Sequence, residues 1–118
     1  MAAVSNVVVG LVAALHAYFL VLEMFLWDKP AGLKAFGQTL EQARASKVLA
    51  ANQGLYNGFL AAGLVWGLMQ GTAGLSIKTF FLGCVVVAGL YGAVTASRKI
   101  LFVQAMPAAV ALALLWLS

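Results

Sequence analysis

Residues 4–27 read VSNVVVGLVAALHAYFLVLEMFLW, and this run decides the class of fold. It contains one charged residue, Glu23, and it exceeds the roughly 20 apolar residues that a helix needs to cross the hydrocarbon core of a bilayer. The whole chain of 118 residues is 64% hydrophobic and 8% charged. A typical soluble domain has far more charged residues, so this composition excludes that class of protein. We therefore expect an all-α integral membrane protein that forms one domain over residues 1–118.

Three further apolar runs follow, and each predicts another membrane span. With the first span at 4–27, the others lie at about 48–69, 77–97 and 100–117. The segment QGTAGLS between the second and third runs is rich in turn residues. The turn at Arg98 and Lys99 is so short that the last two helices must be antiparallel neighbours. The sequence thus predicts a four-transmembrane-helix bundle in an up-down-up-down arrangement.

The basic residues are distributed unevenly between the connections, and their distribution predicts the orientation. Two of the three connections contain Lys29, Lys34, Arg44, Lys47, Arg98 and Lys99, whereas the other has only Lys78 beside it. Because basic connections are retained in the cytoplasm, we expect both termini to lie outside. This topology also accounts for the net charge of +4. The expected partner is therefore the lipid bilayer, and nucleic acid is not expected.

The connection over residues 28–47 contains more than turn residues. Pro30 and Gly32 favour a turn, and then Leu33, Phe36 and Leu40 follow at helical spacing. This pattern predicts a short amphipathic helix on the cytoplasmic surface of the membrane, with its basic residues toward anionic headgroups. A solvated linker is the alternative interpretation.

Polar and ionisable residues within the predicted spans form the candidate site. They are Glu23, His16, Asn52, Gln53, Tyr56, Asn57, Tyr91 and Gln104. The predicted topology places them in the cytoplasmic half of the bilayer, so we expect a polar pocket that faces the cytoplasm. Amides and hydroxyls in membrane helices also serve as simple interhelical hydrogen bonds, and we favour this structural interpretation for Asn52, Thr95 and Gln104 taken singly. For His16 alone the structural and functional interpretations are equally supported. A carboxylate inside a span is by contrast a functional hypothesis by default.

Glu23 and His16 share one face of the first helix but cannot pair. They are seven residues apart, which is about 10 Å along the helix axis. Neutralising a glutamate at pH 7 costs about 3.7 kcal/mol, and inserting a charged acidic residue at mid-bilayer costs roughly 2.5–3.5 kcal/mol. Because these costs are comparable, we expect Glu23 to gain or lose a proton close to neutral pH. Any coupling to His16 must run through the second helix, at Asn57 or Tyr56, or through water.

The chain is poor in metal ligands. It has one cysteine, Cys84, and one histidine, His16. Transition-metal sites in proteins are built mainly from histidine, cysteine and carboxylate groups. We therefore expect neither a metal site nor a bound cofactor.

Glycines recur at four-residue spacing along the second predicted span. One set is Gly54 and Gly58, and the other is Gly63, Gly67 and Gly71. Such small faces let helix backbones approach closely. The two sets are out of phase, so we expect one set to pack the bundle and the other to contact a second copy in a homodimer.

Three segments of the chain resemble a known family. The stretches HAYFLVLEMFLW, KPAGLKAFG and LAANQGLYNGFLAAGLVWGL closely resemble the bacterial inner-membrane family called domain of unknown function thirteen-oh-four. The resemblance implies four helices and a multi-pass location in the bacterial inner (plasma) membrane. It places His16, Glu23, Asn52, Gln53, Tyr56 and Asn57 within the distinctive segments of the family. It implies no established activity.

Three functions remain in competition. The first, which we favour, is binding or transport of a small molecule, because the plan is similar to that of the small multidrug-resistance transporters, in which a glutamate of the first helix exchanges protons for a cation. The second is a membrane-embedded enzyme for a lipid-like substrate, with Glu23 and His16 as acid and base. The third is a structural or accessory subunit in which the polar cluster only fastens the bundle.

Overall fold

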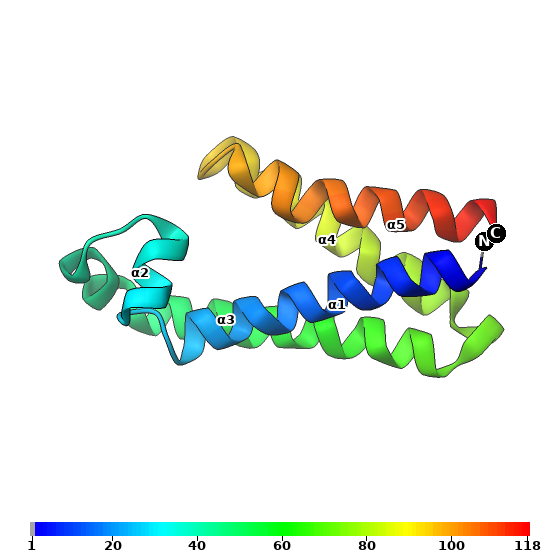
Figure 1. Ribbon diagram of the computed structural model, residues 1–118, viewed down its shortest axis with the longest axis horizontal. Helices are drawn as coiled ribbons and strands as arrows, with labels where there is room; N and C mark the ends of the chain where they lie inside the picture. The colour runs from blue at the N-terminus through cyan, green and yellow to red at the C-terminus, as the bar shows by residue number, and fades with distance from the viewer. Residues whose placement is uncertain (1) are drawn as a thin grey trace. The chain divides into compact units, whose positions relative to one another are not determined.

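The computed structural model describes residues 2–118, and every regular element in this range is helical. The elements are α1 (Ala2–Met24), α2 (Pro30–Phe36), α3 (Leu40–Met69), the 3-10 helix η1 (Gly71–Gly74), α4 (Leu75–Thr95), the π-helical segment η2 (Leu101–Ala105) and α5 (Met106–Leu117) (Figure 1). The all-α class is thereby confirmed. Two helical stretches, Ala2–Met24 and Gly71–Thr95, are long and apolar enough to cross a membrane, and the apolar stretch Leu101–Leu117 is shorter.

The chain divides into two compact units. Unit 1 contains Met1–Ala14 and Leu60–Ser118, and unit 2 contains Leu15–Phe59. Helices α1 and α3 therefore contribute residues to both units.

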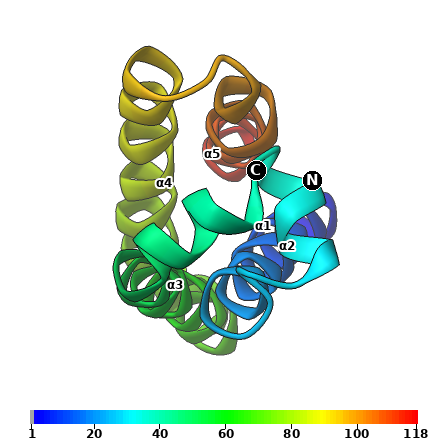
Figure 2. The ribbon, with the colours of Figure 1, turned by 90° about the vertical axis from the view of Figure 1, so that its left-hand side faces the viewer.

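The hydrophobic core lies in unit 1. Its buried members come from α1, α3, α4 and α5 and are Val9, Val12, Ala13, Leu64, Leu82, Val85, Ala108, Ala111 and Leu115. Figure 2 shows α4 and α5 joined by the turn that follows Thr95. A Cβ atom on Gly89 of α4 would lie 2.6 Å from the backbone nitrogen of Ala105, so only glycine permits this close approach. The predicted antiparallel pairing of the last two helices is confirmed.

The π-helical segment has a cause in the sequence. Pro107 has no backbone N–H, so the carbonyl of Val103 loses its α-helical donor. The backbone N–H of Met106 donates to the carbonyl of Leu101, five residues earlier, which is the π-helical pattern. At the far end of α5 the indole of Trp116 donates to the hydroxyl of Thr79 at 3.1 Å, so the end of α5 lies beside the start of α4.

In unit 2, α1 ends earlier than the expected span. It stops at Met24, and Trp27 lies in the following turn instead of in the helix. The ring of Trp27 packs on Phe36 of α2 at 4.8 Å, and its indole donates to the hydroxyl of Ser46 at 3.2 Å. These contacts favour the turn. Pro30 and Gly32, which were expected to form a turn, lie in α2, and Gly32 lets α2 approach the turn because a Cβ at this position would lie 2.0 Å from the carbonyl oxygen of Leu26.

The expected amphipathic helix of the first connection is interrupted. Helix α2 ends at Phe36 because Gly37 adopts a left-handed conformation with φ 60°. Helix α3 then begins at Leu40, eight residues before the expected start of the second span at residue 48. The reason is a capping box, in which Thr39 and Gln42 each bond the backbone N–H of the other at 2.9 and 3.1 Å.

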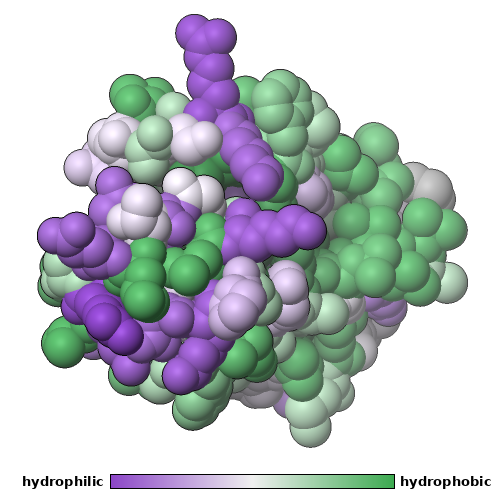
Figure 3. Space-filling view, turned by 60° about the vertical axis from the view of Figure 1, so that its left-hand side comes forward, coloured by the Kyte–Doolittle hydropathy of each residue, from purple (hydrophilic) through white to green (hydrophobic). Residues whose placement is uncertain are grey.

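The connection is nonetheless strongly polar. Figure 3 shows hydrophilic side chains gathered on the face brought forward in that view. The connection contributes Asp28, Lys29, Lys34, Glu41, Arg44 and Lys47.

The remaining helix limits agree with expectation, since α4 and the stretch from η2 to α5 match the runs 77–97 and 100–117 to within two residues.

Candidate functional site

The site is centred on a buried carboxylate held by an amide. Asn57 of α3 donates its side-chain N–H to Glu23 Oε1 of α1, and the two residues are only 6% and 8% exposed. The glycines of α3 permit this approach, because a Cβ on Gly54 would lie 2.7 Å from a side-chain carbon of Met24. Likewise a Cβ on Gly58 would lie 2.6 Å from the side chain of Leu20. Small residues thus bring the two helices close enough for one amide to reach the carboxylate.

His16 is the other ionisable residue on this part of α1. It is fully buried, and its ring contacts Phe19 edge to face at 5.3 Å. Because seven residues separate it from Glu23, the two side chains lie about 10 Å apart along the axis. At this separation the imidazole of His16 and the carboxylate of Glu23 do not form an acid–base pair.

The remaining polar residues of unit 2 do not join the buried pair. Asn52 and Gln53 are exposed, and Tyr56 is 50% exposed. The amide of Asn52 donates to the hydroxyl of Tyr56 at 3.3 Å, as side chains four residues apart on one helix face can do. Gln53 also lies four residues before Asn57, but Asn57 is buried and donates to Glu23, whereas Gln53 is exposed.

Two expected site residues belong to unit 1. Tyr91 is 72% exposed on α4, and Gln104 is half-buried in the π-helical segment. Their inclusion with Glu23 stays a prediction.

The glycines of α3 face two different helices, which confirms that the two sets are out of phase, whereas Gly71 lies beyond α3 in η1 and a Cβ there would meet nothing within 4 Å. Gly54 and Gly58 pack on α1, whereas a Cβ on Gly63 or Gly67 would lie 2.4 Å from Phe81 or 2.6 Å from Lys78 of α4. Both neighbours belong to the same chain. These faces therefore pack the protein internally, and a homodimer stays a prediction.

Lys78, which counts in the sequence only toward the predicted topology, is a buried residue of unit 1. It is 6% exposed, and its amine donates to the side-chain oxygen of Asn6 at 3.2 Å. Its stem packs over Gly67. The signal in the sequence is its position as the fourth residue of α4, within an apolar stretch, Gly71–Thr95, that is otherwise free of charge. An ionisable residue within such a run indicates a buried partner.

The chemistry available at Glu23 follows from its surroundings. Among residues 2–118 there is no group of three or more histidine, cysteine or acidic side chains that could hold a metal ion. The carboxylate has one oxygen engaged by Asn57, and a carboxylate has about four lone-pair positions for donors. Glu23 can therefore accept a proton or a further donor while Asn57 holds it in place.

These features define an all-α protein with two helices able to cross a membrane and one buried carboxylate–amide pair. The chain belongs to the family described as Protein of unknown function (DUF1304), whose sequence model matches residues 10–116. It is similar to the Uncharacterized protein YpaA of Lactococcus lactis subsp. lactis (strain IL1403), with 30% identity over 104 residues that cover 86% of this chain and 87% of that protein. No solved structure matches the chain significantly.

Proposed function

We propose that the chain is a multi-pass protein of the bacterial inner membrane that binds or transports a small molecule at Glu23. Four helices cross the bilayer in an up-down-up-down bundle, both termini lie outside, and the polar connection around α2 lies on the cytoplasmic surface. Glu23 exchanges a proton for the ligand, and Asn57 positions its carboxylate.

The distribution of apolar side chains supports the membrane placement. Large hydrophobic residues that are more than two thirds exposed occur on α3, α4 and α5 and are Val48, Leu49, Met69, Val87, Tyr91, Val94 and Leu117. Among them Val87, Tyr91 and Val94 are spaced four and three residues apart and so share one face of α4, and soluble monomers rarely expose large contiguous apolar patches. In a bilayer these side chains contact lipid. The stretch Leu101–Leu117 also reaches about 26 Å at 1.5 Å per residue, close to the roughly 30 Å of the hydrocarbon core.

The burial of Glu23 against a single amide is the observation that carries the proposed function. A carboxylate within an apolar helix is expensive and is found where it serves an ion, a proton or a ligand. One amide donor leaves acceptor capacity on this carboxylate. A lipophilic cation matches both the charge and the apolar surroundings.

The same hydrogen bond favours a second candidate function. In a structural subunit the pair would only fasten α1 to α3, as amides do between many membrane helices. The two functions differ in one respect, because a fastening pair stabilises the protein without binding any ligand.

Tetraphenylphosphonium, a lipophilic cation, is the probe for the test. We expect calorimetry of the detergent-solubilised protein, in two buffers of different ionisation enthalpy, to show cation binding with release of a proton. Glu23→Gln abolishes both signals. The control Glu41→Gln, which removes an exposed carboxylate from the first turn of α3, leaves both signals unchanged.

Two outcomes contradict the proposal. Cation binding that survives in Glu23→Gln removes the role of the carboxylate. A wild-type protein that binds no cation, and retains no small molecule in native mass spectrometry, leaves the structural function in its place.

The topology is tested separately with fusions of alkaline phosphatase to Ser118 and to the turn at Arg98, where only the first should be active.

A further inference from the structure

A groove runs along unit 1 where α4 meets the π-helical segment. Its volume is about 650 Å³, and it is lined by Leu90, Ala93, Val94, Arg98, Leu101 and Phe102. Leu90, Ala93 and Val94 share one face of α4 because they are three and four residues apart. Val94 and Phe102 are 86% and 60% exposed. The groove is therefore open to the surface and lined by apolar side chains, and its single charged group is the guanidinium of Arg98.

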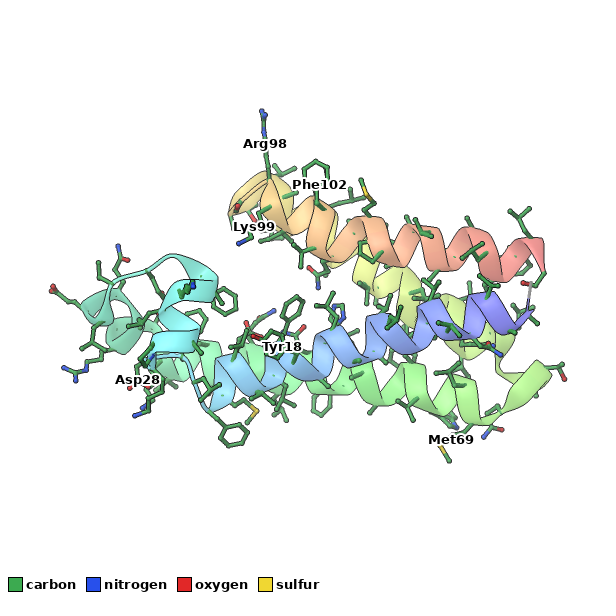
Figure 4. All side chains as sticks on the ribbon, in the orientation of Figure 1. Tyr18, Asp28, Met69, Arg98, Lys99 and Phe102 are labelled. Atoms are coloured by element: carbon green, nitrogen blue, oxygen red, sulfur yellow. The ribbon has the colours of Figure 1, made fainter. Side chains whose placement is uncertain are left out.

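The charge of Arg98 has no acidic complement in its own unit. The three acidic residues of the chain are Glu23, Asp28 and Glu41, and all of them belong to unit 2. Figure 4 shows Arg98 and Phe102 projecting to the same side of the turn, whereas Lys99 projects to the opposite side. Arg98 and Phe102 thus lie on the same side of this turn, and both line the groove.

We propose that this groove binds an anionic phospholipid, with an acyl chain along the apolar wall and the phosphate at Arg98. A guanidinium binds phosphate oxygens in a bidentate manner and is the preferred side chain for this purpose. Basic pockets between membrane helices on the cytoplasmic side bind anionic headgroups. A free phosphate would use only Arg98 and would not occupy the apolar part of the groove, whereas a phospholipid uses both, so the lining favours a lipid.

The inference uses the membrane placement proposed above, but it does not use Glu23. Failure of one site therefore leaves the other intact. If the lipid binds and tetraphenylphosphonium does not, the groove stands without the transport function. In the reverse case the transport function stands without the groove.

Native mass spectrometry of the detergent-solubilised protein with added phosphatidylglycerol tests the groove. We expect Arg98→Gln to weaken lipid binding about tenfold, as the loss of a charged hydrogen bond does. The matched control Lys99→Gln removes the same charge one residue further along, and it leaves the affinity unchanged. Val94→Trp fills the groove without changing any charge, and it also weakens binding. Glu23→Gln has no effect on this binding.

Several results overturn the proposal. Equal weakening by Arg98→Gln and Lys99→Gln means that only diffuse charge attracts the lipid. Full affinity in Val94→Trp means that the apolar wall is not used. Equal binding of phosphatidylcholine removes the selectivity for an anionic lipid, and displacement by millimolar inorganic phosphate assigns Arg98 to a free anion. Circular dichroism checks that each variant keeps its helical content, which is expected because Arg98, Lys99 and Val94 are exposed.

Discussion

Asn57 donates its side-chain amide to the carboxylate of Glu23, and this bond joins α3 to α1 across 34 positions of the sequence. Both side chains are buried, so each supplies the other with a partner that water does not provide. A buried carboxylate without a donor costs more than the bond itself contributes, because its desolvation is then uncompensated. The bond is thus a determinant of stability as well as of the site.

Asn57→Leu is predicted to lower the free energy of unfolding by about 1–3 kcal/mol, the cost of leaving a buried polar group unsatisfied. Unfolding in mixed micelles, followed by circular dichroism, measures the change. The control is Asn52→Leu on the exposed side of the same helix, which should stay within about 0.5 kcal/mol of wild type.

A double-mutant cycle with Glu23→Ala isolates the bond. Because contacting residues couple, we expect an interaction energy of about 0.5–3 kcal/mol between the two substitutions. Strictly additive effects would show that the amide stabilises α3 by some route other than Glu23.

In the hydrogen bond between Lys78 and Asn6, loss of the acceptor is expected to cost more stability than loss of the buried donor. Asn6→Leu leaves the buried amine of Lys78 without its acceptor and should cost about 1.5–3 kcal/mol, the range for hydrogen bonds to charged groups. Lys78→Met removes the amine while its stem still covers Gly67, so it should cost less than Asn6→Leu. The double variant should recover stability relative to Asn6→Leu alone, and a Lys78→Met protein less stable than Asn6→Leu would contradict this account.

The selection of Asn57 over its neighbours shows how much of the site was accessible from sequence. Glu23 was identifiable as a candidate from sequence alone, because it is the only charged residue in the apolar run 4–27. The identity of its partner depends on which face of α3 turns toward α1, and the small face at Gly54 and Gly58 decides this. Asn57 lies three residues after Gly54 and therefore shares that face, whereas Asn52 lies on the opposite side. The sequence therefore contains the signal that selects Asn57 as the partner of Glu23.

Helix limits were predictable where composition alone decides them. The long apolar runs gave α4 and the last helical stretch to within two residues. Hydrophobic spacing does not predict the start of α3 at Leu40, because this start depends on the capping pair Thr39 and Gln42. The end of α1 was missed because it depends on contacts of Trp27 with Phe36 and Ser46, which lie further along the chain and cannot be inferred from local spacing.

Glycine-to-alanine substitutions on α4 should have opposite signs at two positions. Gly89→Ala places a methyl group 2.6 Å from the backbone nitrogen of Ala105, and overpacking of this kind costs about 1–3 kcal/mol. Gly83→Ala meets nothing within 4 Å and should stabilise the helix by up to about 1 kcal/mol. Thermal unfolding of the two variants in the same detergent measures the difference. Equal behaviour would show that the close approach of α4 to Ala105 is absent in solution.

The ion pair between Asp28 and Lys47 predicts a dependence on pH. The amine of Lys47 donates to the Asp28 carboxylate at 3.0 Å and holds the pKa of that carboxyl below its ordinary value of 3.8. The unfolded chain then binds more protons than the folded chain, so stability rises with pH. The contribution of the pair is fully present above about pH 3.8 and is lost as the pH falls through the lower pKa of the folded protein.

Carbon-13 NMR of the Asp28 carboxyl in micelles should give a titration midpoint below 3.8. Lys47→Gln should raise this midpoint, and Lys34→Gln should leave it in place. A wild-type midpoint at or above 3.8, or an equal shift in both variants, would show that Lys47 does not stabilise the charged carboxylate.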